Sequence, residues 1–315
     1  MNLNKFKYYV IHGLISILPS VIFRYTTTKL LANFEEKKHK EVMKRVDYYN
    51  KLTHSFELNH DVQEVQTIKD FHKTGGNTYY FDLLKVIKGF TPENLFSVLN
   101  GDIRHVPEQP SFLKSRPIAG ENQNSVILKL NAIRHFQFVN DKLSFRDKKD
   151  MVAWRGVGFK PHRQVVIKQF YHHPMCNLGQ TRPNEGQPWE KGFMSIKEQL
   201  QYKFLLAIEG NDVASNLKWA MSSNSLVIMS KPKYETWFME GQLKAGYHYV
   251  EVKDDYSDLI EKMEYYLTHT DEAEIIIQNS NQWVEQFKDP KRERLISLLV
   301  AQKYFQKSGQ VVSNE

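Results

Sequence analysis

From residue 151 onward, segments with the pattern of buried strands alternate with segments of helical spacing. Residues 151–156 (MVAWRG) have the pattern of a strand that runs into a loop. Residues 161–173 follow with helical spacing behind Pro161, which suits a first helical turn. Further strands are expected at 203–210, 225–229 and 247–252, with a helix at 214–224 and closing helices from Tyr256 to about Lys307. This alternation predicts an α/β fold, a parallel sheet with helices on both faces.

The first half of the chain has a less regular pattern. Residues 81–90 have helical apolar spacing, and residues 94–102 form an apolar run that stops in a turn at Asn100-Gly101. Three other segments, a charged solvated helix, a strand and a hairpin around Asn140-Asp141, are expected at 35–51, 125–130 and 138–145. A chain of 315 residues predicts about two domains. Because the pattern changes after the charged stretch 146–150, the expected division is a segment at 1–34, a first domain at 35–148 and a second domain at 149–315.

The N-terminal segment is apolar and basic. Its apolar run from Tyr8 to Phe23 is sixteen residues long and contains Pro19, so it is short for a spanning helix, which needs about 20 residues. Residues 1–34 contain lysines and an arginine but no Asp or Glu, and no small-residue cleavage site follows the run. We therefore expect this segment to lie on an anionic membrane surface. A helix packed into the core and a true span remain the alternatives.

The overall charge narrows the class of partner. The net charge of +7 favours anionic partners such as nucleotides, phospholipids or nucleic acid. Nucleic acid is not expected, because the chain has no RNP, helix-turn-helix or zinc-finger pattern. The single cysteine, Cys176, cannot form an internal disulfide and is expected to be an inert buried thiol.

Two loops in the second half could bind an anion, because ligands of parallel sheets bind beyond the carboxyl ends of the strands. The first loop, WRGVGFKPHR, begins at Trp154. Two glycines, Gly156 and Gly158, let the backbone approach a ligand closely. Three cations supply fixed positive charge and fork-like hydrogen-bond donors: Arg155, Lys160 and Arg163. An ordinary glycine-containing turn is the alternative, since the loop matches neither a Walker loop nor a G-x-G-x-x-G fingerprint.

The second loop, EGNDVASNLK at 209–218, has a mixed character. Gly210 and Asn211 turn the chain, and Ser215 and Lys218 would lie in the first turns of the next helix. The carboxylate of Glu209 would repel a phosphate unless it faces a sugar hydroxyl. A sugar nucleotide offers both kinds of contact, so this class of ligand fits the loop better than free phosphate.

Asp102 follows the apolar run of residues 94–100 and is a candidate general base. Burial and neighbouring charges can tune the pKa of a carboxylate in such a position, although an aspartate that caps a turn has the same pattern. We find no D-x-D, His cluster or C-x-x-C, so no metal site is expected, and no G-x-S-x-G elbow indicates a serine nucleophile.

Three stretches, in their order and spacing, resemble glycosyltransferase family 90: WRGVGFKPHR, QYKFLLAIEGNDVASNLKWAMSSNSLVIM and ETWFMEGQLKAGYHYVEVKDDYSDL. They cover about residues 150–265. The resemblance to the bacterial lipopolysaccharide branch extends back through NLFSVLNGDIRHVPEQPSFLKSRPI at 94–118. The family also holds fungal capsule xylosyltransferases and animal protein O-glucosyltransferases.

The resemblance implies a GT-B type fold, two Rossmann-like halves facing across a cleft, with residues 35–148 as the acceptor-side domain and residues 149–315 as the nucleotide-sugar-binding domain. Because the lipid A-core acceptor of the bacterial branch is glycosylated at the cytoplasmic face of the inner membrane, the resemblance also implies that the protein lies there. The resemblance further implies an inverting enzyme that moves a hexose, glucose or galactose, from a UDP-sugar to lipopolysaccharide core or another surface glycan, without a cofactor or a metal. By position Asp102 resembles the family's base, although animal members have N-x-x-D where this chain has Asn100-Gly101-Asp102. The donor-binding residues implied are Trp154, Arg155, Gly156, Arg163, Glu209, Gly210, Asn211, Ser215, Asn216 and Lys218.

This chain departs from the family pattern at two of these positions. Gly158 and Asn216 stand where the family has arginines, which leaves more of the diphosphate charge to the remaining cations and backbone N–H groups. Three alternatives stay open: a capsule glycosyltransferase, a protein O-glycosyltransferase, or a non-catalytic protein that binds membranes or anions.

Overall fold

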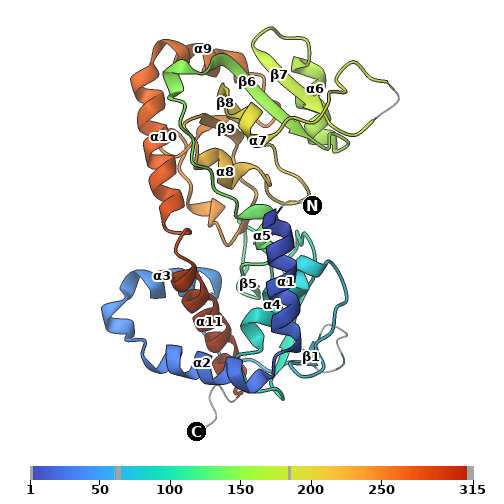
Figure 1. Cartoon of the computed structure of the whole chain (residues 1–315), viewed down its shortest axis with the longest axis vertical. Helices are drawn as coiled ribbons and strands as arrows, with labels where there is room; N and C mark the ends of the chain where they lie inside the picture. The colour runs from blue at the N-terminus through green and yellow to red at the C-terminus, as the bar shows by residue number, and fades with distance from the viewer. Residues whose placement is uncertain (1–2, 60, 62–64, 184–185, 311–315) are drawn as a thin grey trace. The chain divides into compact units, whose positions relative to one another are not determined.

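The computed structural model describes residues 3–59, 61, 65–183 and 186–310, and side chains from Phe6 onward. The chain forms two compact units (Figure 1). Unit 1 comprises residues 1–134, 234–238 and 287–315, and unit 2 comprises residues 135–233 and 239–286. The chain therefore crosses between the units more than once, and its last helix returns to unit 1.

Unit 2 is built on a five-stranded sheet in which every neighbouring pair is parallel. Its strands, in the spatial order β11-β9-β8-β6-β7, are β6 (Lys149–Gly156), β7 (Cys176–Gln180), β8 (Tyr202–Leu206), β9 (Leu226–Ser230) and β11 (Val250–Val252). Continuous apolar burial, as along β8, is typical of a strand covered on both faces. The predicted α/β sheet with its parallel strands is confirmed.

Helices pack against this sheet and close its core. They are α6 (Pro161–Phe170), α7 (Ile196–Gln199), α8 (Leu217–Met221), α9 (Leu259–Thr268) and α10 (Thr270–Glu285), with short 3-10 turns at η2 (Phe145–Asp147) and η3 (Glu240–Gln242). Side chains from β6, α6, β8, β9 and α10 form one apolar cluster, which includes Val152, Ile167, Phe204, Ile228 and Ile276. This core fixes the carboxyl ends of β6 and β8 side by side.

Unit 1 is mainly helical. Its helices are α1 (Leu3–Ile17), α2 (Ser20–Ala32), η1 (Glu36–Lys38), α3 (Lys40–Tyr49), α4 (Asn77–Ile87) and α11 (Pro290–Lys307), and α5 (Ala132–His135) joins it to unit 2. Its strands are short: β1 (Val65–Thr67), β2 (Leu95–Ser97), β3 (Ser111–Leu113), β4 (Ser115–Pro117), β5 (Ser125–Ile127) and β10 (Tyr234–Thr236). β1 pairs with β2, β3 with β5, and β4 with β10, while a parallel bridge from Val98 to Phe112 joins β2 to β3.

A buried charged network ties the C-terminal helix into unit 1. Glu293 of α11 is 4% exposed, and its carboxylate contacts Arg45 Nη1 of α3, Lys129 Nζ and the indole nitrogen of Trp237, each at 2.7 Å. Because these partners come from distant parts of the sequence, the carboxylate links α11 to α3 and to the segments that contain Lys129 and Trp237.

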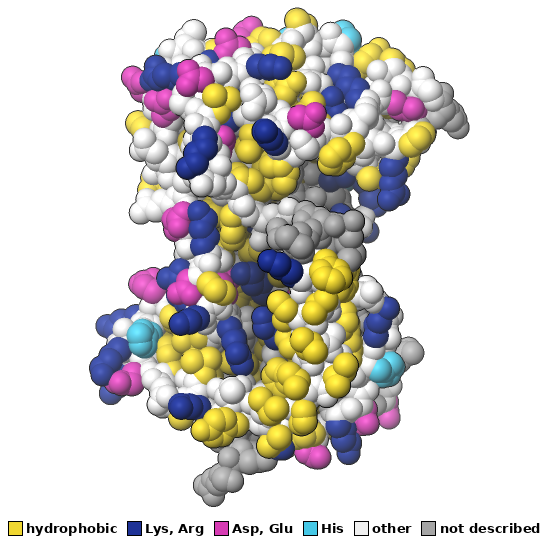
Figure 2. Space-filling model, in the orientation of Figure 1, with side chains coloured by type: hydrophobic (Ala, Val, Ile, Leu, Met, Phe, Trp, Pro, Cys, Tyr) yellow, Lys and Arg dark blue, Asp and Glu magenta, His cyan; other side chains and the backbone are white. Residues whose placement is uncertain are grey.

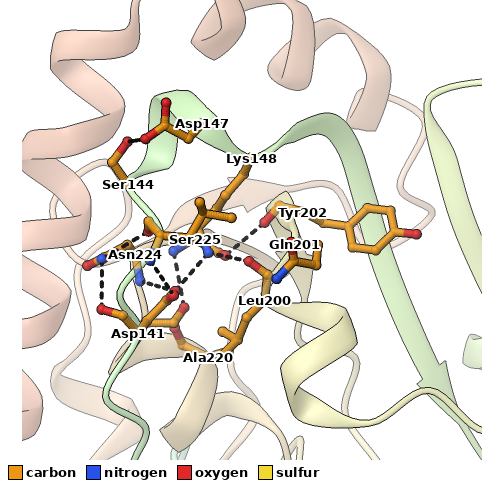
Figure 3. A network of polar contacts seen from close by, with 12 residues as sticks. Asp141, Ser144, Asp147, Lys148, Leu200, Gln201, Tyr202, Ala220, Asn224 and Ser225 are labelled. Atoms are coloured by element: carbon orange, nitrogen blue, oxygen red, sulfur yellow. Dashed lines mark hydrogen bonds and ion pairs between the residues drawn. The ribbon is translucent and has the colours of Figure 1, made fainter.

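The predicted hairpin at 138–145 is wrong. These residues form a loop instead, because Asp141 makes local and long-range polar contacts that a hairpin would break (Figure 3). Its carboxylate pairs with Lys148 Nζ at 2.7 Å and accepts a hydrogen bond from Asn224 N at 3.0 Å. The same contacts draw residues 135–148 into unit 2, so that unit begins before the predicted boundary at residue 149.

The two predicted Rossmann-like halves differ in the described part of the chain. Unit 2 has the extended parallel sheet, whereas the strands described in unit 1 are three residues long. The GT-B arrangement stays a prediction. Among the described residues, no single helix is long and apolar enough to cross a membrane. α1 from Phe6 and α2 meet that criterion only as a pair, and they are bent by 101°.

Candidate active site

Asp102 lies in unit 1, in the loop after β2, and two side chains from other elements hold it. Gly101, with a φ of +105°, turns the chain sharply before it, a conformation that favours glycine. Tyr79 of α4 donates its hydroxyl proton to Asp102 Oδ1 at 2.8 Å, and Lys114 Nζ lies 2.5 Å from the same oxygen. The Asp102 side chain is 21% exposed, whereas that of Lys114 is 2% exposed. The carboxylate is therefore fixed on its buried side and accessible to solvent.

The Asp102 carboxylate has a buried cation and a tyrosine hydroxyl as its partners. A buried ammonium group beside a carboxylate favours the ionised form of both partners. Burial is the main cause that raises the pKa of Tyr79, to about 12; the nearby Asp102 adds to the rise, and Lys114 opposes it. Tyr79 therefore stays a hydrogen-bond donor near neutral pH, and Asp102 can accept a proton from a third group.

Sequence reasoning proposed Asp102 as a candidate base but did not indicate its partners Tyr79 and Lys114. Tyr79 had no distinguishing signal, because a tyrosine at helical spacing is usually a core residue. Lys114 did have one, since it directly follows the apolar pair Phe112 and Leu113, and a lysine is almost never buried without a partner.

Residues on either side of Asp102 in the chain line a cavity of about 530 Å³ within unit 1. Its wall combines apolar and hydrogen-bonding groups, and some of the latter already bond to each other: the Ser111 hydroxyl donates to Ser97 Oγ at 2.8 Å, and Asn59 N donates to Gln109 Oε1 at 3.0 Å. The lining comprises Asn59, Ser97, Leu99, His105, Val106, Pro107, Glu108, Gln109 and Ser111. Its size is within the usual range for small-ligand sites.

In unit 2, Arg163 joins the two predicted anion-binding loops. From the first turn of α6, its guanidinium donates to Glu209 O at 2.8 Å, to Val157 O at 2.8 Å and to Ile208 O at 3.0 Å. It also lies over the Trp154 ring, 5.3 Å from the centroid. The loops that follow β6 and β8 are therefore held together beside a cation at the carboxyl edge of the sheet.

The glycines of these loops are positions of close packing. A Cβ at Gly156 would lie 2.7 Å from the Trp154 ring. At Gly158 a Cβ would lie 2.4 Å from Gln180 Oε1 and 2.8 Å from Ile167, so the site has no room for the arginine of the family pattern. Gly210 is less tight, since a Cβ there would lie 3.4 Å from Arg163 Nη2. The departure at Gly158 is thus built into the packing of β6, β7 and α6.

Arg155 makes a different set of contacts. Its guanidinium donates to Asn177 O and Asn177 Oδ1, each at 2.7 Å, and to Trp154 O at 2.9 Å. Burial lowers the pKa of Arg155, but an arginine remains charged at any physiological pH. These N–H groups bond to β7 and to its own strand, β6. The contact of Arg155 with the diphosphate of a sugar donor stays a prediction.

The second loop contains residues of unequal exposure. Asn211 is exposed and Ser215 half-buried, while Glu209 Oε1 accepts a hydrogen bond from Lys233 N at 3.0 Å. Lys218 is fully buried and pairs with Glu240 Oε1 at 2.6 Å, so its predicted role at a diphosphate remains a prediction while its observed partner is a carboxylate.

The helix predicted at 214–224 is shorter than expected. α8 begins at Leu217 and has five residues, because Asn216 Nδ2 donates back to Leu206 O at 2.7 Å and the chain before it is irregular. α6, with ten residues and an exposed Lys160 at its N-terminal boundary, is the longer helix that begins at this edge of the sheet.

Two other observations concern the chemistry available. In the part of the chain that the structure describes, no group of three His, Cys, Asp or Glu side chains could hold a metal ion. Cys176 is buried, and burial raises the pKa of its thiol to about 12, so it stays protonated and inert as predicted.

The described features are typical of a group-transfer enzyme. They are a parallel sheet with basic loops at its carboxyl edge and a carboxylate that is fixed by neighbours and accessible to solvent. Comparison with known proteins defines the group. The model of Glycosyl transferase family 90 matches residues 127–292, and the chain belongs to this family. The predicted resemblance is confirmed, and the protein is a glycosyltransferase.

Individual relatives differ in how much of the chain they match. The O-glucosyltransferase LpsA of Dichelobacter nodosus is 41% identical over 306 residues, which is 96% of this chain and 95% of that protein. Protein O-glucosyltransferase 3 of Rattus norvegicus and of Homo sapiens is 28% identical over 51% and 53% of this chain, and over 33% and 34% of those proteins.

Proposed function

We propose that the protein is an inverting glycosyltransferase that moves a hexose from a UDP-sugar to a hydroxyl of lipopolysaccharide core or another surface glycan. Glucose is the favoured hexose and galactose the second choice, because the relative that is similar over nearly the whole chain is named an O-glucosyltransferase. The observation that carries the proposal is the Asp102 carboxylate, fixed by Tyr79 and Lys114 and still exposed enough to reach a substrate.

In the proposed reaction Asp102 takes the proton of the acceptor hydroxyl as its oxygen attacks the anomeric carbon of the donor. The new carbon–oxygen bond forms on the face opposite UDP, and the bond from the anomeric carbon to the diphosphate oxygen breaks, so that UDP leaves with the electron pair. One displacement through an oxocarbenium-like state inverts the configuration. The ion pair with Lys114 would keep Asp102 charged and ready to accept the proton.

The leaving diphosphate needs positive charge, and the proposed source is the edge of unit 2 where Arg163 lies. Arg163, Lys160 and the positive end of the α6 helix dipole would stabilise the charge that develops on UDP. Glu209, Gly210, Asn211 and Ser215 would contact the sugar and the ribose. In this proposal no metal ion takes part.

The acceptor glycan would enter the cavity of unit 1 whose lining includes Leu99 and His105. A sugar offers many hydroxyls and no charge, and a wall of serines, amides and a histidine can donate to and accept from such groups.

A second candidate keeps the reaction but changes the acceptor. The similarity to protein O-glucosyltransferase 3 over half of the chain favours a protein hydroxyl as the alternative, and a capsule glycan is a related option. A non-catalytic anion-binding protein is the candidate from another class.

Calorimetric titration tests the proposal. The purified protein is titrated with UDP, UDP-glucose, UDP-galactose and UDP-xylose, each with and without a chelator, and with a single-stranded oligonucleotide. Binding of UDP-glucose that survives the chelator supports a metal-independent nucleotide-sugar site. Binding of the oligonucleotide alone would replace the proposal by the non-catalytic candidate.

A further inference from the structure

The first two helices have the opposite polarity to that of an ordinary surface helix. A soluble surface helix turns its apolar side inward and its polar side to water. In α1 and α2, large apolar side chains are exposed instead, with Leu14 at 57%, Ile17 at 82%, Val21 at 57% and Tyr25 at 69%. Figure 2 shows an apolar surface where Figure 1 places α1. We call it the N-terminal apolar face; it comprises Phe6, Tyr9, Val10, Ile11, Leu14, Ile17, Leu18, Val21, Ile22 and Tyr25.

The inward side of the same helices is polar. Tyr8 donates its hydroxyl proton to Asp82 Oδ1 of α4 at 2.8 Å, and His12 Nε2 lies 3.6 Å from the same oxygen. Tyr8 and His12 are one helical turn apart, so they lie on the face of α1 opposite to that of Val10 and Leu14. In α2 the buried residue is Thr27, which packs so closely on Gly89 that a Cβ there would lie 2.3 Å from its hydroxyl.

These contacts make the face part of the folded unit rather than a loose tail. Lys88 Nζ donates to Ile15 O at 2.8 Å and to Ser16 O at 3.1 Å, which satisfies carbonyls at the C-terminal end of α1. Hydrogen bonds on the opposite side of α1 therefore fix the helix in the unit with its apolar face exposed. Monomeric proteins rarely leave an apolar surface of this kind to water, so it indicates a partner.

The charges around the face indicate what kind of partner covers it. Lys7 and Lys29 are exposed in α1 and α2, and residues 1–34 contain no Asp or Glu. A second copy bound through a two-fold axis would bring two positively charged patches together, because such an interface uses the same patch on both subunits. A layer of anionic lipid headgroups instead complements the lysines and offers acyl chains to the apolar residues.

We propose that the N-terminal apolar face inserts into the interfacial layer of an anionic phospholipid bilayer, while the Tyr8 and His12 side of α1 stays bonded to Asp82. The bend of 101° between α1 and α2 does not allow them to form one straight span, but both can lie along a surface. Lys7 and Lys29 would contact lipid phosphates, and the aromatic rings of Phe6, Tyr9 and Tyr25 would lie at the headgroup level.

Vesicle flotation tests this proposal without use of the enzyme's activity. The whole protein is mixed with phosphatidylcholine vesicles that contain about 30% phosphatidylglycerol, and with vesicles of phosphatidylcholine alone. The test variant is Leu14→Glu/Ile17→Glu, which keeps the contacts of Tyr8 and His12. The matched control is Phe193→Glu, which changes a residue that is 84% exposed in unit 2. Circular dichroism and gel filtration check that each variant is folded and record its oligomeric state.

We expect the wild-type protein and Phe193→Glu to float with the anionic vesicles, and the double variant to bind them about tenfold or more weakly. We expect the wild-type protein to bind vesicles of phosphatidylcholine alone more weakly than anionic vesicles, because its lysines then have no anionic headgroups to contact. Equal flotation of the double variant, or no flotation of the wild-type protein, would overturn the proposal. A wild-type dimer that the double variant converts to monomer would also overturn it, because a second copy would then cover the face.

Discussion

At the scale of single residues, Asp102 depends on a cation that the chain buries beside it. Lys114→Met removes this cation but keeps a long apolar side chain in its place. An uncompensated carboxylate binds a proton more readily, so the acidic limb of the profile of kcat/KM against pH is expected to move to higher pH. A pH series of the transfer rate measures the shift, with Lys73→Met, an exposed lysine, as the control. An unmoved acidic limb would mean that Lys114 does not act on the base.

Arg155 and Arg163 are both expected at the donor diphosphate, but their contacts differ. Arg155 shares its bonds with Asn177, so Asn177→Ala removes the side-chain part of these contacts and leaves the guanidinium in place. If Arg155 binds the diphosphate, Arg155→Ala weakens UDP binding about tenfold or more, whereas Asn177→Ala leaves the dissociation constant near that of the wild type. Calorimetry with UDP compares them. Equal loss in both variants would assign Arg155 to the support of β7.

Arg163 donates to three carbonyl groups, so its loss is expected to affect folding as well as binding. Arg163→Ala leaves Val157, Ile208 and Glu209 carbonyls without this partner, and we expect a loss of about 3 kcal/mol or more in the free energy of unfolding. Denaturant unfolding measures the loss, and UDP should bind more weakly under native conditions. A variant as stable as the wild type would show that water replaces the guanidinium at these carbonyls.

At the scale of elements, Asp82 couples the attachment of α1 to pH. Burial raises the pKa of Asp82 to about 6, although hydrogen bonds from Ala132 N and Tyr8 oppose the rise. His12 also faces it, as do Lys85 and Lys129. The folded state holds the proton more tightly than the unfolded chain, so the stability from protonated Asp82 falls as pH rises from about 4 to about 6.

Asp82→Asn removes this ionisation and keeps a similar shape. Relative to the wild type, the variant is expected to gain stability as pH rises from about 4 to about 7, by on the order of 3 kcal/mol. The difference in unfolding free energy between the two proteins, measured by urea titration at each pH, isolates the effect from other titrating groups. A difference that does not change with pH would show that Asp82 does not ionise in that range.

The elements also show what the sequence could and could not predict. The strands of unit 2 follow a local pattern of apolar residues, and the sequence located all the central ones. The length of α8 and the loop at 138–145 depend on single long-range hydrogen bonds, from Asn216 to Leu206 and from Asn224 to Asp141, which no local pattern encodes. In the same way, Asp102 could be identified from its position after a strand, but Tyr79 and Lys114 come from other elements.

At the scale of the whole molecule, α11 packs in unit 1, the same unit that contains the first 134 residues of the chain. The sequence predicted a closing helix but placed it in the second domain, because helical spacing does not say which partner a helix meets. Glu293 of α11 pairs with Arg45 and Lys129, and these ion pairs attach the helix to unit 1. Glu293→Ala leaves two cations in the interior without their carboxylate, and we expect a loss of about 3 to 5 kcal/mol.

Thermal or denaturant unfolding measures this loss, with Glu285→Ala as a control at an acidic residue near the end of α10. UDP binding should persist in Glu293→Ala at low temperature, because the proposed donor loops belong to unit 2. A change in stability below about 1 kcal/mol would mean that the network does not hold α11.

The most direct test of the central claim is the transfer rate of Asp102→Asn, measured beside its affinity for UDP. The asparagine keeps the size of the side chain but cannot accept the acceptor's proton. We predict that transfer of the hexose from the UDP-sugar falls about 10² to 10⁴-fold, the usual contribution of a general base, while the dissociation constant for UDP stays unchanged. Transfer at a near-normal rate would contradict the assignment of Asp102 as the base.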